Sequence, residues 1–282
     1  MLNTMQLRIE IQRSVAAALA EDVGTGDLTA CLIPSDTEAR GRVITREAAV
    51  MCGSAWFETT FEALDPTATV LWDVRDGELL EPGQTLCEIV ANARVLLTAE
   101  RTALNFVQLL SGTATVTRRY VEAVAGTRAM IVDTRKTLPG LRLAQKYAVV
   151  TGGGCNHRVG LYDGILIKEN HIIAAGGIEA AVTRARQLAA PDVFIEVEVE
   201  TLEQLETALA AGVKMILLDN MELDTMRRAV DITNDRAELE ASGGVNLERV
   251  RAIAETGVHR ISIGGLTKDV RAIDLSLRHV EE

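Results

Sequence analysis

Short runs of Val, Ile and Leu recur through the second half of the chain, and each ends in polar residues before a segment with helical spacing. These runs cover residues 130–133, 164–167, 193–197, 215–218, 237–241 and 260–263. Neighbouring parallel strands need a long connection, which is usually a helix. The alternation therefore predicts an α/β barrel of parallel strands with crossover helices.

The first third of the chain has a less regular rhythm. Apolar residues at helical spacing between Leu7 and Leu19 predict a helix, and strand-like runs at 41–50, 69–74 and 84–90 are separated by turn residues. A long helical tract follows, with Thr98 as its N-cap and Gly112 as a stop or kink. We expect an N-terminal domain over residues 1–112 and a barrel domain over 113–269, with a final helix at 270–282 packing back on the first domain.

Composition narrows the class of protein. The 282 residues carry a net charge of −11, which disfavours nucleic acid and anionic membranes as partners. The four cysteines form no C-x-x-C pair, the start of the chain lacks a signal-peptide pattern, and no apolar stretch approaches the ~20 residues that span a bilayer. We expect a cytoplasmic protein with reduced thiols.

Basic residues gather at predicted strand ends and in a glycine-rich loop, although the protein is acidic overall. They are Arg135, Lys136, His157, Arg158 and Lys168. In a barrel the loops after the strands build the active site, and arginine forks with lysine charges bind carboxylates and phosphates. The set predicts a polyanionic substrate. Any one of these Lys or Arg residues alone would fit an ordinary soluble surface, and His157 alone would fit a structural histidine.

Acidic residues follow the neighbouring strands. Glu196, Glu198 and Glu200 alternate, which places them on one face of a strand, and Asp219 ends the next strand. Such carboxylates suit sugar hydroxyls or Mg²⁺, which binds a few carboxylates together with substrate phosphates and water. An internal salt-bridge layer is the alternative.

Glycines close the last two predicted strands, at 243–244 after Ser242 and at 264–265. Glycine-rich loops that lead into a helix N-terminus at this place in a barrel commonly bind phosphate. A plain strand-end turn is the alternative.

Several longer motifs resemble one family in order along essentially the whole chain. They are E-D-V-G-T-G-D-L-T (21–29), D-T-R-K-T-L-P-G-L-R (133–142), K-Y-A-V (146–149), G-G-G-C-N-H-R (152–158), L-I-K-E-N-H (166–171), E-V-E-V-E (196–200), L-L-D-N (217–220) and E-A-S-G-G (240–244). The family is quinolinate phosphoribosyltransferase, the carboxylating nicotinate-nucleotide pyrophosphorylases. The second and fourth of these motifs are highly specific, and none of the family's motifs is missing.

The resemblance implies an α/β fold with an N-terminal α/β sandwich domain and an incomplete, about seven-stranded α/β barrel. It implies phosphoribosyl transfer from phosphoribosyl pyrophosphate to quinolinate with decarboxylation, which gives nicotinate mononucleotide, pyrophosphate and CO₂ in de novo NAD biosynthesis. It also implies a homodimer, sometimes further assembled, in which Arg101 of each subunit completes the neighbour's site.

Residue roles follow from the resemblance in the same way. Quinolinate is assigned to Arg135, His157 and Arg158, the pyrophosphate to Lys136 and Lys168 (Lys168 also lying near the pyridine acid), and the ribose and Mg²⁺ to Glu198 and Asp219. The 5′-phosphate cradle and the remaining substrate contacts are assigned to Ser242, Gly243, Gly244, Gly264, Thr134 and Ser262.

Three rival interpretations fit these residues less well. A paralogue of the same fold would act on another pyridine or cofactor precursor, and would be expected to lack one of the arginines. A barrel aldolase would use Lys168 as a Schiff-base lysine, which requires a depressed pKa. A biotinyl-like binding module at 76–89 would need a lysine to modify, and that segment has none.

Overall fold

The structure is a computed structural model that describes residues 4–280, and the chain folds into two compact units. The first unit comprises the chain up to residue 118 together with 137–153 and the segment from 266 onward. The second unit comprises 119–136 and 154–265. The chain therefore crosses between the units more than once.

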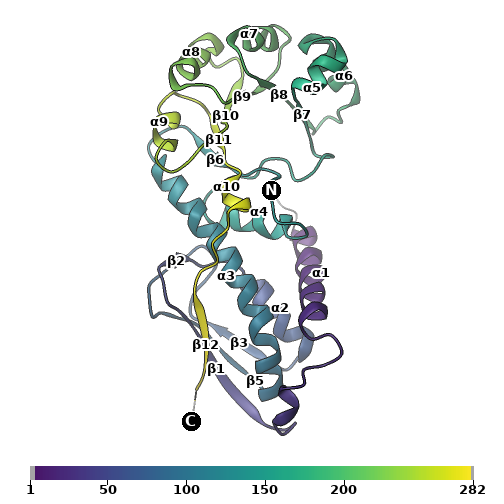
Figure 1. Ribbon diagram of the computed structural model, residues 1–282, viewed down its shortest axis with the longest axis vertical. Helices are drawn as coiled ribbons and strands as arrows, with labels where there is room; N and C mark the ends of the chain where they lie inside the picture. The colour runs from purple at the N-terminus through teal and green to yellow at the C-terminus, as the bar shows by residue number, and fades with distance from the viewer. Residues whose placement is uncertain (1–3, 281–282) are drawn as a thin grey trace. The chain divides into compact units, whose positions relative to one another are not determined.

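An antiparallel sheet forms the centre of the first unit, with strand order β12-β1-β5-β3 (Figure 1). Its strands β1 and β5 are each eight residues long and alternate between buried and more exposed positions, as a sheet with two different faces requires. The elements of this unit are α1 (Thr4–Asp22), a 3₁₀ turn (Ala30–Leu32), β1 (Glu38–Thr45), β2 (Ala49–Val50), α2 (Ser54–Leu64), β3 (Thr69–Trp72), β4 (Leu79–Leu80), β5 (Thr85–Asn92), most of α3 (Ala93–Ala123), α4 (Arg142–Thr151) and β12 (Leu275–His279).

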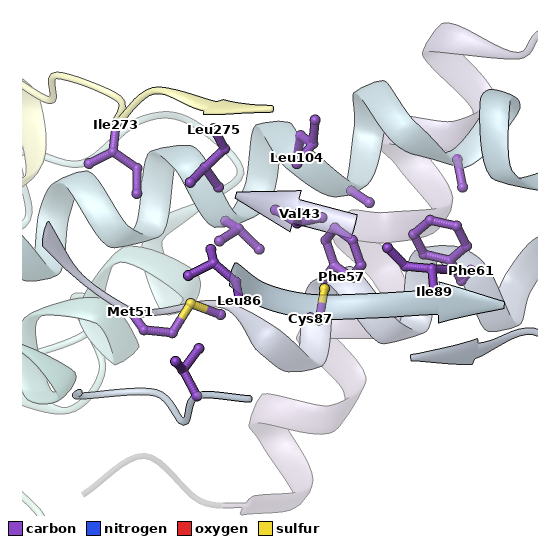
Figure 2. Close-up of a cluster of buried hydrophobic side chains, with 14 of the residues drawn as sticks. Val43, Met51, Phe57, Phe61, Leu86, Cys87, Ile89, Leu104, Ile273 and Leu275 are labelled. Atoms are coloured by element: carbon purple, nitrogen blue, oxygen red, sulfur yellow. The ribbon is translucent and has the colours of Figure 1, made fainter. Parts of the chain in front are cut away.

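The core of this unit lies between the sheet and two helices. Figure 2 shows Phe57 and Phe61 of α2 and Leu104 of α3 beside Val43 and Ile89 of the sheet, and all five are fully or almost fully buried. Removal of this apolar surface from water is the main force that holds the layers together. The arrangement confirms the expected α/β sandwich.

Helix α3 is longer than the sequence pattern predicted. It begins at Ala93, before the predicted N-cap Thr98, and runs through Gly112 to Ala123 without ending there. Of the two predictions for Gly112, a stop or a kink, the stop was wrong, because this glycine serves close packing. A Cβ at that position would overlap the backbone carbonyl oxygen of Arg271.

The expected helix at 270–282 was also wrong. Leu275–His279 form strand β12, which pairs antiparallel with β1 from Thr45↔Leu275 to Gly41↔His279. Apolar Leu275 and Leu277 alternate with polar neighbours, which is the period of a strand. The last two residues of the predicted helix lie outside the described part of the chain.

The second unit is built on a six-stranded parallel sheet with strand order β6-β11-β10-β9-β8-β7. Its strands are β6 (Met130–Val132), β7 (Gly164–Ile167), β8 (Phe194–Val199), β9 (Met215–Asp219), β10 (Glu238–Ser242) and β11 (Arg260–Ser262), and its helices are α5 (Glu169–Ala175), α6 (Ile178–Leu188), α7 (Leu202–Ala210), α8 (Leu223–Thr233) and α9 (Val250–Ala254). The short helix α10 (Gly265–Lys268) lies where the chain returns to the first unit. All six predicted strands are confirmed.

The strand order is that of an opened barrel. Strands β7, β8, β9, β10 and β11 pair in chain order, each with the next, and β11 also pairs with β6. The order is therefore cyclic except between β6 and β7. In Figure 1 helices α5 to α9 lie along the outside of this curved sheet. Cys155 adds a parallel bridge to Val132 on the open side of β6, in the position of a seventh strand.

Candidate active site

A cavity of about 270 Å³ lies at the carboxyl ends of the barrel strands, entirely within the second unit. Strands β7 to β11 contribute residues to its wall, and the residues that follow β6 complete it. The lining residues are Asp133, Thr134, Arg135, Lys136, His157, Arg158, Leu166, Lys168, Glu198, Leu217, Asp219, Glu240, Ser242 and Ser262. All but two of them are polar, so the cavity is suited to a highly polar ligand.

Two arginines stand on the same side of the cavity. Arg135 follows β6, and Arg158 donates from Nη1 to the backbone carbonyl of Gly164 at 3.0 Å. Burial, and after it the positive charge of Arg135, lowers the pKa of the Arg158 guanidinium. Two cations held near each other favour a ligand that carries negative charge on more than one group.

Glycine at position 164 is needed for this arrangement. A Cβ there would lie 2.6 Å from the ring of Phe194 and 3.2 Å from Cβ of Arg158. The absence of a side chain lets β7 pass close to both residues.

Two lysines also line the cavity, one after β6 and one after β7. Lys168 directly follows β7, and its Nζ donates to Oε2 of Glu198 at 2.6 Å. The backbone N–H of Lys136 donates to Oγ1 of Thr134 at 3.0 Å, and a Cβ on Gly264 would lie 2.9 Å from Cδ of Lys136. The loop after β11 therefore passes close along the Lys136 side chain.

The ends of β9 and β10 are joined through Asn220. This residue has a positive φ of 52°, its backbone N–H donates to the carbonyl of Ser242 at 3.0 Å, and its Nδ2 donates to Asp219 Oδ2 at 2.9 Å. Gly243 packs against it so closely that a Cβ would overlap Oδ1 of Asn220. These contacts fix the Asp219 carboxylate beside the serine–glycine loop.

A buried layer of acids lies beneath the basic groups. Nε2 of His157 is 2.8 Å from Oε2 of Glu196 and 3.7 Å from Oε2 of Glu240, and the two glutamates are 0% and 2% exposed. Burial, and after it the charge of Glu196, raises the pKa of Glu240 to about 7. Asp133, also fully buried, accepts the backbone N–H of His157 at 2.8 Å and Nδ2 of Asn156 at 2.7 Å.

The predicted acidic row is only partly on one face. Glu196 and Glu198 point to the inside of the barrel from β8, whereas Glu200 follows the strand, is exposed, and donates its backbone N–H to Gln204. Glu196 therefore belongs to an internal layer, which was the alternative interpretation, whereas Glu198 is part of the cavity wall.

The structure brings most of the residues predicted for the site together. Ten of them line the cavity: Thr134, Arg135, Lys136, His157, Arg158, Lys168, Glu198, Asp219, Ser242 and Ser262. Gly264 lies against the lining residues Lys136 and Thr134, Gly243 packs against Asn220, and Gly244 follows Gly243 with its Cβ position open. Arg101 is exposed on α3 in the first unit, so it is not part of this cavity within one chain's second unit.

Two polar cavity residues were not singled out as site residues from the sequence. Asp133 directly follows the first barrel strand, and this position at a strand end was a signal that could have placed it. Glu240 lies inside the strand run at 237–241 and carried no such signal, because nothing local distinguishes a buried acid from an exposed one.

Fold and cavity together define a class: an α/β-barrel enzyme whose strand-end site is built for a substrate with several anionic groups. Residues 113–278 match the family description "Quinolinate phosphoribosyl transferase, C-terminal domain", and residues 25–111 match "Quinolinate phosphoribosyl transferase, N-terminal domain". The chain belongs to the quinolinate phosphoribosyltransferase family.

Individual relatives align with this chain along nearly their full length. The chain is 46% identical to the nicotinate-nucleotide pyrophosphorylase [carboxylating] of Mycobacterium leprae, covering 94% of this chain and 95% of that one. It is 42% identical to the probable nicotinate-nucleotide pyrophosphorylase [carboxylating] of Bacillus subtilis, covering 95% and 93%. The solved nicotinate-nucleotide pyrophosphorylase of Francisella tularensis superposes with a TM-score of 0.93 at 45% identity, covering 96% of each chain.

No helix of residues 4–280 combines the length and the apolar character that crossing a membrane demands.

Proposed function

We propose that this chain transfers the phosphoribosyl group of phosphoribosyl pyrophosphate to quinolinate with loss of CO₂, and so forms nicotinate mononucleotide and pyrophosphate for de novo NAD biosynthesis. The observation that carries the proposal is the cavity wall in a chain of this family: paired arginines, two lysines and two carboxylates at the strand ends. These groups match a pyridine dicarboxylate on one side and a phosphorylated sugar on the other.

The dicarboxylate is assigned to the arginine side of the cavity. Arg135 and Arg158 repel each other in the free site, and a ligand with two carboxylates relieves this repulsion through bidentate contacts. His157 lines the same side and is expected to contribute to this subsite. In a homodimer, Arg101 of the partner subunit would complete it.

The phosphorylated sugar is assigned to the rest of the cavity wall. Lys136 and Lys168 would bind the pyrophosphate, with Thr134 and Ser262 beside them on the wall. The 5′-phosphate would lie in the loops at Ser242–Gly244 and Gly264, whose glycines let backbone N–H groups approach a ligand closely.

Magnesium is proposed at Glu198 and Asp219. Both carboxylates line the cavity beside the lysines, and oxygen donors of this kind, completed by substrate oxygens and water, are what Mg²⁺ prefers. When bound, the ion would add positive charge where the leaving group gains negative charge.

The chain's own groups account for the chemistry as follows. Departure of pyrophosphate leaves an oxocarbenium-like ribose, and Lys136 and Lys168 stabilise the negative charge that develops on the leaving group. The arginines orient quinolinate so that its ring nitrogen faces the anomeric carbon, which is catalysis by positioning. Once the nitrogen is alkylated, the C2–CO₂⁻ bond breaks, its electron pair stays on C2 beside the positively charged nitrogen, and the 2-carboxylate leaves as CO₂. C2 then takes a proton from solvent, which gives nicotinate mononucleotide.

A reducing compartment such as the cytoplasm is proposed as the location. The four cysteines of the chain are free, and Cys52 and Cys87 are buried thiols. Free, buried thiols are typical of proteins kept in a reducing environment.

The test is to incubate the purified protein with phosphoribosyl pyrophosphate, Mg²⁺ and either quinolinate or nicotinate, and to follow nicotinate mononucleotide by chromatography. Product from quinolinate and none from nicotinate supports both the substrate and the carboxylating chemistry. A folded sample that gives no product from quinolinate refutes the proposal in favour of a paralogue acting on another pyridine. Omission of Mg²⁺ with a chelator present tests the metal, since activity should fall and return on adding it back.

A further inference from the structure

The segment that crosses the open side of the barrel is tied to both sides of the opening by its own side chains and backbone. Cys155 pairs with β6, Arg158 donates to the carbonyl of Gly164 at the start of β7, and His157 reaches Glu196 on β8. Within residues 4–280, β6 and β7 are not paired in the sheet, and residues 155–158 take the place of a strand there. This is also the segment that presents Arg158 to the cavity.

The His157 ring has a partner on each nitrogen. The backbone N–H of Arg158 donates to Nδ1 at 2.8 Å, so Nδ1 carries a lone pair. The hydrogen of the neutral ring must then sit on Nε2, where Oε2 of Glu196 accepts it at 2.8 Å. With both nitrogens engaged within the protein, the imidazole has no donor left for a ligand.

The same geometry argues against a metal at this place. His157, Glu196 and Glu240 offer ligand atoms within 4.8 Å of one another. A neutral imidazole that binds a metal through Nε2 must carry its hydrogen on Nδ1, and there it would meet the N–H of Arg158. The cluster is therefore a hydrogen-bonded support, with Glu196 as its acceptor.

We propose that Glu196 is a positioning residue: through the imidazole of His157 it fixes the backbone and guanidinium of Arg158, and so controls binding of the pyridine dicarboxylate without touching it. This inference rests on the proposed function. It also changes the part expected of His157, which would act on quinolinate through Arg158. Glu196 is fully buried, so the hydrogen bond is made away from solvent and its loss is not compensated by water.

Two substitutions at Glu196 distinguish the effect of losing the hydrogen bond from the effect of changing the side-chain volume. Glu196→Met keeps a similar length and removes the acceptor, and Glu196→Gln keeps an acceptor oxygen. We expect Glu196→Met to raise the KM for quinolinate at least about tenfold while the KM for phosphoribosyl pyrophosphate changes much less, and Glu196→Gln to recover most of that loss. Glu240→Met is the matched comparison from the same buried layer, and its effect on the quinolinate KM should be smaller because Glu240 lies 3.7 Å from Nε2.

A spectroscopic measurement covers the case in which a variant fails to fold. The chain has four histidines, so ¹⁵N-histidine NMR spectra are simple, and His157→Asn identifies the resonances of that ring. The wild-type protein at neutral pH should show His157 as the Nε2–H tautomer with Nδ1 unprotonated. A doubly protonated or Nδ1–H ring in the wild type overturns the proposal.

The kinetic outcomes are equally decisive. An unchanged quinolinate KM in Glu196→Met, or an equal loss for both substrates, assigns Glu196 no positioning role. If the wild-type protein neither binds nor converts quinolinate, the proposed function fails on its own, and the tautomer measurement still decides how His157 is held.

Discussion

Gly243 and Gly244 follow β10 in the same loop but meet different surroundings. Gly243 has φ of +96°, and a Cβ there would overlap the side chain of Asn220 and lie 3.1 Å from its backbone nitrogen. Gly244 has φ of +57°, inside the left-handed region, and the nearest atom to a Cβ is Nη1 of Arg249 at 4.0 Å. The pair allows backbone strain to be separated from displacement of a neighbour.

The expected costs differ accordingly. Gly244→Ala pays mainly for a left-handed alanine, about 1 kcal/mol. Gly243→Ala adds displacement of Asn220 and its hydrogen bond to the Asp219 carboxylate, so we expect roughly 2–4 kcal/mol of destabilisation. Because Asp219 lines the cavity, kcat/KM for phosphoribosyl pyrophosphate should also fall at least about tenfold in Gly243→Ala.

Urea unfolding and steady-state kinetics on both variants measure the two effects. Gly244→Ala is the control for a substitution in the same loop. Because Gly244 belongs to the proposed 5′-phosphate cradle, it serves as a control for the unfolding measurement only, and equal free energies of unfolding in the two variants would refute the argument that the contact with Asn220 fixes this loop.

Other predictions concern the charged groups. Arg135→Ala should lower kcat/KM for quinolinate by at least about a hundredfold, because one half of the dicarboxylate grip is lost; near-normal kinetics would contradict this assignment. Lys168→Ala should lower kcat by a similar factor, because the leaving pyrophosphate is stabilised less well. Single-turnover measurements should show a slower chemical step, and an unchanged rate of this step would contradict the role of Lys168. The pKa of Glu240 is raised in the fold to about 7, so its favourable contribution is present at low pH and is lost as pH rises from its ordinary range near 4.5 to about 7. Denaturation at several pH values should show stability falling over this window by at most about 1.4 kcal/mol per pH unit, and Glu240→Gln should flatten the profile if the carboxyl is the cause.

Much of the barrel could be predicted because its signal is local. A buried parallel strand needs a short apolar run, and its crossover needs a helix, so the six strands were readable from residues 130 to 263 without any tertiary contact. Strand ends then had to carry the chemistry, and this placed Arg135, Lys168 and Asp219 in one cavity.

Elements whose structure depends on a partner distant in the sequence were harder to predict from the sequence. Gly112 reads locally as a helix stop, and only the backbone at Arg271 explains why a glycine sits inside α3. The last segment was expected to be a helix, whereas β1 supplies an edge to which it adds as β12. Hydrophobic periodicity describes a segment's faces and not the surface it will meet.

For this protein the sequence by itself determined the kind of chemistry, since residue types and their order at the strand ends already specified a site for carboxylates and phosphates. Only the tertiary structure decided which acidic side chains line the cavity and which lie buried beneath it and hold other residues in place. Glu196 and Glu198 stand two residues apart on one strand, yet the first is buried against His157 and the second pairs with Lys168 at the cavity. The reason is physical: burial and hydrogen-bond partners are set by neighbours that the fold brings from other strands, and no local pattern encodes them.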